Sequence, residues 1–220
     1  MGYIASNCVV LETLWLENCN ITKPLVNVLN KCTTLTELRI QSAGNKPSDP
    51  VQYEDIDTQT KSIFANVSCP SLRKLAVLDH MDLSEIIALT AAFPNVAEIE
   101  LHGLCRCEPA FLALTEWTKL EKVDFNFPYG NLFSALMCAA LALSAQTLRI
   151  LNLNSATDEA DLPALQALLS QCVHLGDVSI ETSTPPEEQP DITKIVAQCC
   201  GANLVYLRVP ASYEFSPVAA

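Results

Sequence analysis

The sequence predicts an α/β solenoid, a horseshoe in which a parallel inner sheet of about eight short strands is covered by outer helices. Three observations predict it. An apolar motif recurs along the chain, an apolar residue precedes each copy at a nearly fixed distance, and helical periodicity fills the intervals between copies. The chain has 220 residues, and we expect residues 1–220 to form a single repeat domain.

The recurring motif is L-x-x-L-x-L, with Ile, Val or Phe also allowed, and it occurs eight times. Successive first positions lie 24, 37, 24, 24, 28, 27 and 29 residues apart. Eight copies in register over nearly the whole chain indicate repeats, each contributing one short strand. The copies are Leu11/Leu14/Leu16, Leu35/Leu38/Ile40, Leu72/Leu75/Val77, Val96/Ile99/Leu101, Leu120/Val123/Phe125, Leu148/Leu151/Leu153, Leu175/Val178/Ile180 and Leu204/Leu207/Val209.

A second mark accompanies the motif. Seven copies have an apolar residue three positions before the first leucine, and the last copy has Cys200 four positions before Leu204. This position ends the helix that precedes each strand, where a small or soft side chain packs inside the turn. We therefore expect these residues to be buried. The seven are Cys8, Cys32, Cys69, Phe93, Trp117, Ala145 and Cys172.

Helices are predicted between the strands, because the apolar spacing there changes from two residues to about 3.6. Helix-start signals agree: Asp82 and Glu85 form a capping box, while Asp161 and Asp191 precede apolar stretches. No repeat could bury its leucines alone, so neighbouring repeats must stack. The segments with helical periodicity are 25–29, 86–89, 111–114, 165–169 and 192–196.

With these motifs the chain resembles the leucine-rich-repeat family, in its cysteine-containing and ribonuclease-inhibitor-like subclasses. It is most similar to the repeat arrays of F-box proteins. The strand motifs carry the resemblance, together with Cys32, Cys69 and Cys172, and the turn from Leu16 to Cys19 fits the consensus L-x-N/C. The resemblance implies a non-catalytic protein–protein interaction scaffold, the substrate-recruiting repeat region of an F-box-type ubiquitin ligase receptor.

Two insertions, at residues 43–57 and 182–191, interrupt the regular spacing. Both are rich in proline and acidic residues, so we expect exposed loops that either bind a partner or are tolerated surface insertions. The first copy of the motif begins abruptly after Cys8, which already occupies a helix-ending position. We therefore expect this chain to be the C-terminal part of a longer protein.

The amino-acid composition limits the classes of partner that the protein can bind. Thirteen Lys and Arg against 25 Asp and Glu give a net charge of −12, which argues against nucleic-acid binding. No secretory signal and no apolar run long enough for a membrane span is visible, so we expect an intracellular protein, cytoplasmic or nuclear. Its thiols are then reduced, and we expect them to be buried except Cys19, Cys105 and Cys107. We expect a monomer within a larger complex.

The candidate binding surface is the concave face of the sheet, to which the residues between the motif leucines point. Equivalent positions of adjacent strands are neighbours, so Glu98 is expected beside Lys74 and Lys122, and Glu100 beside Asp124. An acidic centre flanked by lysines predicts a basic or mixed-charge protein segment as partner. The partner-binding candidates are Trp15, Arg39, Lys74, Glu98, Glu100, Lys122, Asp124, Asp177, Tyr206 and Arg208.

Two of these candidates are aromatic. Trp15 and Tyr206 lie near the two ends of the predicted sheet, and exposed aromatic residues are frequent in binding hot spots. The alternative is that a terminal segment covers each of them.

Catalysis and metal binding find little support. The three histidines fall in different repeats, without a Ser-His-Asp arrangement around them. Neither the pair Cys105 and Cys107 nor the adjacent pair Cys199 and Cys200 has the spacing of a zinc site. We expect no catalytic residue, no metal and no cofactor.

Two alternatives to the F-box-type scaffold remain. One is an inhibitor or regulator module that binds one protein partner on its concave face; the other is an enzyme with an unrecognised site. An F-box encoded upstream would favour the scaffold, and turnover of a substrate would favour the enzyme.

Overall fold

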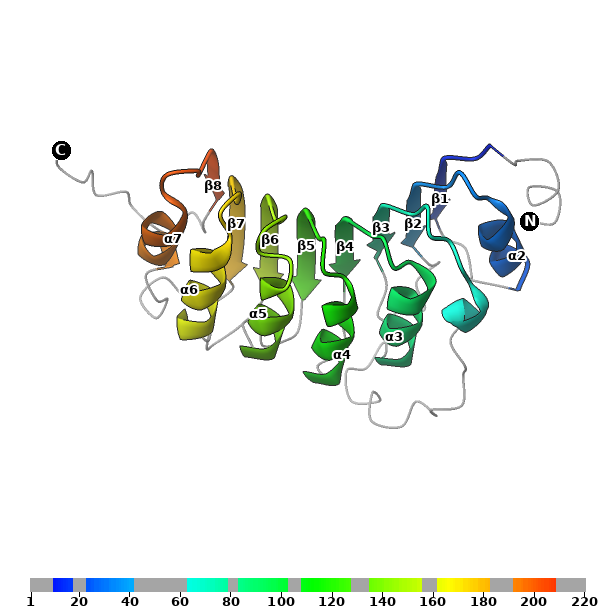
Figure 1. Cartoon of the computed structure of the whole chain (residues 1–220), viewed down its shortest axis with the longest axis horizontal. Helices are drawn as coiled ribbons and strands as arrows, with labels where there is room; N and C mark the ends of the chain where they lie inside the picture. The colour runs from blue at the N-terminus through cyan, green and yellow to red at the C-terminus, as the bar shows by residue number, and fades with distance from the viewer. Residues whose placement is uncertain are drawn as a thin grey trace. The chain divides into compact units, whose positions relative to one another are not determined.

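The computed structural model describes residues 10–17, 23–41, 63–78, 83–102, 108–127, 135–155, 162–182 and 192–208. Within them the chain has an α/β fold whose parallel strands follow one another in sequence order, with helices between them (Figure 1). The predicted fold class is therefore confirmed. The insertion at 43–57 and nearly all of the one at 182–191 lie outside the described residues, as do Cys8, Cys19, Cys105 and Cys107.

The chain divides into two compact units, Met1–Trp117 and Thr118–Ala220. The expectation that residues 1–220 form one domain stays a prediction.

In the first unit, four parallel strands pair in chain order, and helical segments lie on one side of them (Figure 1). The elements are β1 Thr13–Glu17, α2 Lys23–Lys31, β2 Glu37–Gln41, the 3₁₀ helix η2 Ile63–Asn66, β3 Lys74–Val77, α3 Leu83–Ala92, β4 Glu98–His102, α4 Glu108–Ala113 and the 3₁₀ helix η3 Leu114–Glu116.

The core of the first unit lies between the strands and their helices. In β2, Leu38 and Ile40 are fully buried, whereas Glu37 and Arg39 on the other face remain partly exposed. The helices contribute one apolar side each, because residues three and four positions apart lie on the same side of a helix. Helix α2 buries Leu25, Val28 and Leu29, and helix α3 buries Ile86, Ala88, Leu89 and Ala92.

The second unit repeats this arrangement with four more parallel strands, paired in chain order. Within the described part of the chain, no helix is both long enough and apolar enough to span a membrane. The elements are β5 Lys122–Phe127, α5 Ala135–Ala142, β6 Ile150–Ser155, α6 Leu162–Gln171, β7 Asp177–Thr182, α7 Ile192–Cys200 and β8 Tyr206–Arg208.

Burial in the second unit follows the same alternation until its last strand. Leu151 and Leu153 of β6 are buried, as are Val178 and Ile180 of β7. Leu207 of β8 is only half-buried, because β8 pairs with a described strand on one side alone. An end strand has fewer neighbours to cover its apolar side chains.

The helix-ending positions are buried as the spacing predicts. Every described member, from Cys32 to Cys172, is at most 4% exposed, and Cys200 is 3% exposed. The largest of them, Trp117, also satisfies its one polar atom: its indole N–H donates to the carbonyl of Phe93, with an N···O distance of 2.8 Å. Burying an indole without such a partner would cost stability.

A backbone contact repeated between neighbouring repeats sets the strand register. The carbonyl of Glu12 accepts hydrogen bonds from the amides of Thr36 and Glu37, at 2.8 and 3.0 Å. The carbonyls of Thr36, Arg73, Glu121, Arg149 and Gly176 accept equivalent pairs of hydrogen bonds from the next repeat. These hydrogen bonds therefore fix where each strand starts relative to the strand beside it.

Side chains add a second set of contacts between repeats. Thr34 donates to the carbonyl of Leu11, Ser71 to that of Leu35, and Thr147 to that of Leu120, with O···O distances of 2.8 to 3.0 Å. Each donor stands one position before the first leucine of its motif. A Ser or Thr at this position is therefore a further feature of the repeat in the sequence. The repeat predicted from the sequence is defined by its apolar positions alone.

Candidate functional site

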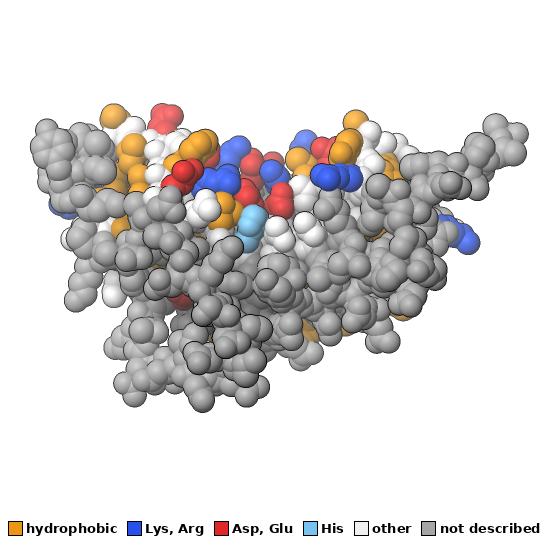
Figure 2. All heavy atoms as spheres, turned by 180° about the vertical axis from the view of Figure 1, so that it is seen from behind, with side chains coloured by type: hydrophobic (Ala, Val, Ile, Leu, Met, Phe, Trp, Pro, Cys, Tyr) orange, Lys and Arg blue, Asp and Glu red, His pale blue; other side chains and the backbone are white. Residues whose placement is uncertain are grey.

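The surface of interest is the face of each unit's sheet that the helices do not cover, which we call the open face. It consists of the strand residues that alternate with the buried ones. Figure 2 shows acidic and basic side chains interleaved on the described surface rather than gathered into separate patches.

In the first unit, the strand register arranges the open face in rows that run across the strands. One row contains Thr13, Glu37, Lys74 and Glu98. The next row contains Trp15, Arg39, Ala76 and Glu100. All of the candidates that the sequence places in this unit, Trp15, Arg39, Lys74, Glu98 and Glu100, lie in these two rows.

Lys74 and Glu98 form an ion pair between β3 and β4, with Nζ and Oε1 3.0 Å apart. The spacing of the repeats predicts that these two residues are neighbours. The hydrogen bond and charge of Glu98 raise the pKa of Lys74 above its ordinary value, and the charge of Glu37 adds to this effect. Lys74 is therefore fully protonated at neutral pH. Because the ion pair between Lys74 and Glu98 is exposed to solvent, it contributes little to the stability of the fold.

Arg39 and His102 approach the same carboxylate. Nη1 of Arg39 lies 3.5 Å from Oε2 of Glu100, and Nε2 of His102 lies 3.4 Å from Oε1. Arg39 reaches across β3, where the small side chain of Ala76 stands between the two in register. This link between β2 and β4 is missed by sequence reasoning that considers adjacent strands only. The sequence feature that could have indicated this contact is the small residue Ala76, which stands between two oppositely charged residues of the same row.

Trp15 is the most exposed aromatic side chain among the described residues, at 60%. Its indole N–H donates to Oε1 of Glu37, with an N···O distance of 2.9 Å. The side chain is thus positioned from β2 while remaining largely in water. The contrast with Trp117, which is 1% exposed, separates a surface tryptophan from a core one.

The strand register also arranges the open face of the second unit in rows. Lys122, Ile150, Asp177 and Tyr206 share one row. In the next row, Asp124 accepts a hydrogen bond from the Asn152 amide, with an N···O distance of 3.0 Å. The five charged or polar residues among these are partly or fully exposed.

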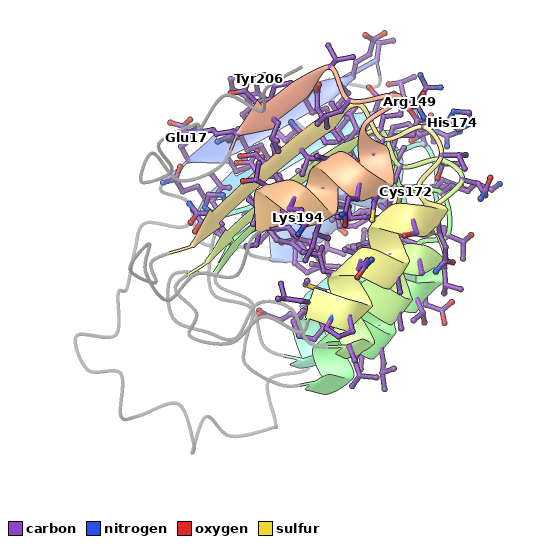
Figure 3. All side chains as sticks on the ribbon, turned by 90° about the vertical axis from the view of Figure 1, so that its left-hand side faces the viewer. Glu17, Arg149, Cys172, His174, Lys194 and Tyr206 are labelled. Atoms are coloured by element: carbon purple, nitrogen blue, oxygen red, sulfur yellow. The ribbon has the colours of Figure 1, made fainter. Side chains whose placement is uncertain are left out.

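Tyr206 lies on β8, on the side of the strand away from the helices, and is 54% exposed (Figure 3). Arg208, two residues further along, is also exposed and shares a row with Asp124. All five candidates of the second unit therefore lie on its open face. The expected neighbours Glu98 and Lys122, and Glu100 and Asp124, belong to different units and stay predictions.

The cysteines near α6 and α7 differ in environment. Cys172 lies between the ends of these helices (Figure 3), and burial raises its pKa from 9.0 to about 12, with a smaller contribution from Cys200. Burial, followed by Cys199, raises the pKa of Cys200 to about 11. Both are unreactive thiols at neutral pH.

The expectation that every cysteine except Cys19, Cys105 and Cys107 is buried is wrong for Cys199, which is half-buried. Its position in α7 puts it beside Ser170, whose hydroxyl donates to Sγ at 3.4 Å, and its thiol donates to the carbonyl of Gln166 at 3.8 Å. In a helix, neighbouring residues point in different directions, so burial of Cys200 turns Cys199 away from the core.

Within the described ranges, no group of three or more His, Cys, Asp or Glu side chains is arranged to hold a metal ion. Comparison of the sequence with models of known families finds no match, and comparison with curated proteins finds no similar sequence. The fold therefore defines the class of molecule, a parallel α/β repeat protein, and its function has to be inferred from the open face.

Proposed function

We propose that this protein is a non-catalytic interaction scaffold of the leucine-rich-repeat type that binds a protein partner on its open face. The observation that carries the proposal is the combination on that face of the exposed, hydrogen-bonded Trp15 with rows of partly exposed charged side chains. Aromatic and arginine side chains in such surroundings dominate the binding energy of many protein interfaces.

The architecture supports this use of the face. Each open-face side chain stands on a strand whose register is set by the paired backbone hydrogen bonds, so its position is determined before a partner arrives. The ion pairs of Lys74 with Glu98 and of Arg39 with Glu100 restrict long side chains further. A preorganised surface loses less conformational entropy on binding than a mobile one.

The net charge of the chain favours partners of a particular charge. With a net charge of −12, the protein attracts basic or mixed-charge segments and repels acidic ones. Nucleic acid and membrane surfaces that carry negative charge are disfavoured for the same reason.

For the cellular role, we propose the substrate-recruiting repeat region of an intracellular F-box-type ubiquitin ligase receptor, with the chain acting as a monomer within a larger complex. The style of the repeats supports this role, through the eight strand motifs and the cysteines that end their helices. An F-box in the full-length transcript, and co-purification with ubiquitin ligase subunits, would test it. Co-purification of one tightly bound partner without ligase subunits would favour a regulator module instead.

The proposal is tested by affinity capture from cell extract followed by mass spectrometry. The triple variant Glu98→Lys, Glu100→Lys and Asp124→Lys reverses three open-face charges, and we expect it to recover at least about tenfold less partner. The matched control reverses three exposed carboxylates outside the open face, which we call the control carboxylates. They are Glu12, Glu116 and Glu121.

Both triple variants change the net charge equally, so a general charge effect would lower recovery with both. Loss of partner with the open-face variant alone supports the proposal, provided that circular dichroism shows an unchanged fold. Equal recovery with the two variants and the unaltered protein would place the binding site elsewhere.

A further inference from the structure

We propose that Trp15 and Glu37 form a binding site for an arginine side chain of the partner protein. The inference rests on the proposed function, because it assigns the chemistry of one contact within the open face. It names a position at β1 and β2 rather than the acidic centre around Glu98 and Glu100 that the sequence favours.

The geometry of Trp15 provides the first argument. Its side chain is 60% exposed, so most of the indole ring remains in contact with water. Its N–H is already bonded to Oε1 of Glu37, which fixes the polar edge of the ring against β2. The remaining surface is aromatic and apolar, and a cation that approaches an indole face is attracted by the ring's electron density.

The distribution of charge provides the second argument. On the open face of the first unit, Lys74 is paired with Glu98, and Arg39 is paired with Glu100. Glu37 differs, because its hydrogen-bond donor is the uncharged indole of Trp15. Among the described residues, no cationic group lies within ion-pairing distance of Glu37. Lys74, the register neighbour of Glu37, interacts with it electrostatically without forming a close ion pair. The Glu37 carboxylate next to Trp15 therefore remains available to a cation of the partner.

The protein's own arginine does not occupy this position. Arg39 is the register neighbour of Trp15 on β2. Its guanidinium instead reaches across Ala76 towards Glu100, with an N···O distance of 3.5 Å. Among the described residues, the guanidinium that stands beside the indole in register is thus engaged by Glu100, and the indole can accept a cation from the partner.

Guanidinium fits this site better than ammonium. Its planar group can stack on the indole while its N–H donors bind the Glu37 carboxylate, and it is less strongly hydrated than an ammonium ion. A lysine would bring a compact, strongly hydrated charge that has no flat surface to stack. The site therefore selects an arginine-bearing segment over a lysine-bearing one.

The two tryptophans allow a direct test by nuclear magnetic resonance, because each gives one indole N–H signal. The protein is titrated with the peptide acetyl-Gly-Arg-Gly-Arg-Gly-amide. Matched peptides carry citrulline, which is similar in shape but uncharged, or lysine in place of arginine. We expect a saturable shift of the Trp15 signal with arginine, and at least about fivefold weaker affinity for lysine and citrulline. The signal of the buried Trp117 should not move.

A variant pair separates charge from shape. Glu37→Gln keeps an oxygen that can accept the indole N–H but removes the charge, and we expect it to weaken arginine-peptide binding at least about fivefold. Glu116→Gln removes one exposed carboxylate elsewhere in the same unit and should leave the affinity unchanged.

The inference is overturned if the Trp15 signal does not move, if citrulline or lysine peptides bind as well as arginine, or if Glu37→Gln has no effect. Such a result leaves the proposed function standing as long as partner capture still depends on Glu98, Glu100 and Asp124. Loss of both dependences would remove the open face as a binding surface altogether.

Discussion

At the scale of single residues, burial decides which positions hold the fold together. Leu151 is fully buried in β6, whereas Asp177 on the neighbouring β7 lies on the open face. We predict that Leu151→Ala lowers the free energy of unfolding by about 2–5 kcal/mol, because the lost methyl groups leave a cavity. Asp177→Ala should cost about 0.5 kcal/mol or less. Chemical denaturation of both variants measures the difference, and equal losses would contradict the assignment of the two faces.

The buried thiols predict a pH dependence of stability. The pKa of Cys172 is about 12 in the folded protein against 9.0 ordinarily, mainly because of burial. Above its ordinary pKa the thiol ionises in the unfolded chain but stays protonated in the folded one, so unfolding becomes easier. The stability that this group contributes is complete below pH 9 and is lost as the pH rises towards 12.

Other groups also titrate in this range, so the measurement compares two proteins. We predict that Cys172→Ala loses less unfolding free energy than the unaltered protein between about pH 8 and about pH 10.5, measured by denaturant titration. Parallel pH profiles for the two proteins would show that the thiol is exposed or ionised in the folded state.

At the scale of elements, contacts between repeats complement the apolar core. Asn30 at the end of α2 donates to the carbonyl of Asn66 and accepts from the amide of Ser68, both at 2.8 Å. Asn27, three residues earlier on the same helix, is exposed. We predict that Asn30→Ala is less stable than Asn27→Ala by about 1–2 kcal/mol, because it leaves two backbone groups without their partner. Both changes raise helix propensity equally, so identical melting temperatures would exclude a role for these hydrogen bonds.

Most elements could be predicted from the sequence, because each strand repeats one apolar spacing. The strand and helix positions of Leu38, Leu89 and Leu168 follow from periods of two and 3.6 residues. Helix α5 has no such pattern, since its alanine-rich segment Ala135–Ala142 is apolar on all sides. The 3₁₀ helix Ile63–Asn66 is also missed. It follows the insertion at 43–57, where the repeat spacing gives no guide.

The candidate site could be predicted only in part. Alternation along the strands correctly places side chains such as Trp15 and Tyr206 on the exposed face. It does not show how long side chains are directed once they leave the strand. The side chain of Arg39 on β2 crosses β3 to reach Glu100 on β4. The indole of Trp15 on β1 donates a hydrogen bond to Glu37 on the adjacent strand β2. These contacts depend on side-chain length and on the small size of Ala76, which periodicity does not measure.

At the scale of the whole molecule, we expect the open face to bind the partner, while the helices and the buried strand face form the scaffold. The open face and the surface outside it carry different carboxylates, so chemical labelling can distinguish them. The described open-face carboxylates are Glu17, Glu37, Glu98, Glu100, Asp124 and Asp177.

Carbodiimide labelling of carboxylates, read by mass spectrometry with and without the captured partner, tests this claim most directly. We predict that the partner slows labelling of the open-face carboxylates by at least about fivefold, because a protein interface excludes water and reagent from its centre. The control carboxylates should be labelled at the same rate in both samples. Protection of the control carboxylates, with unchanged labelling of the open face, would contradict the account.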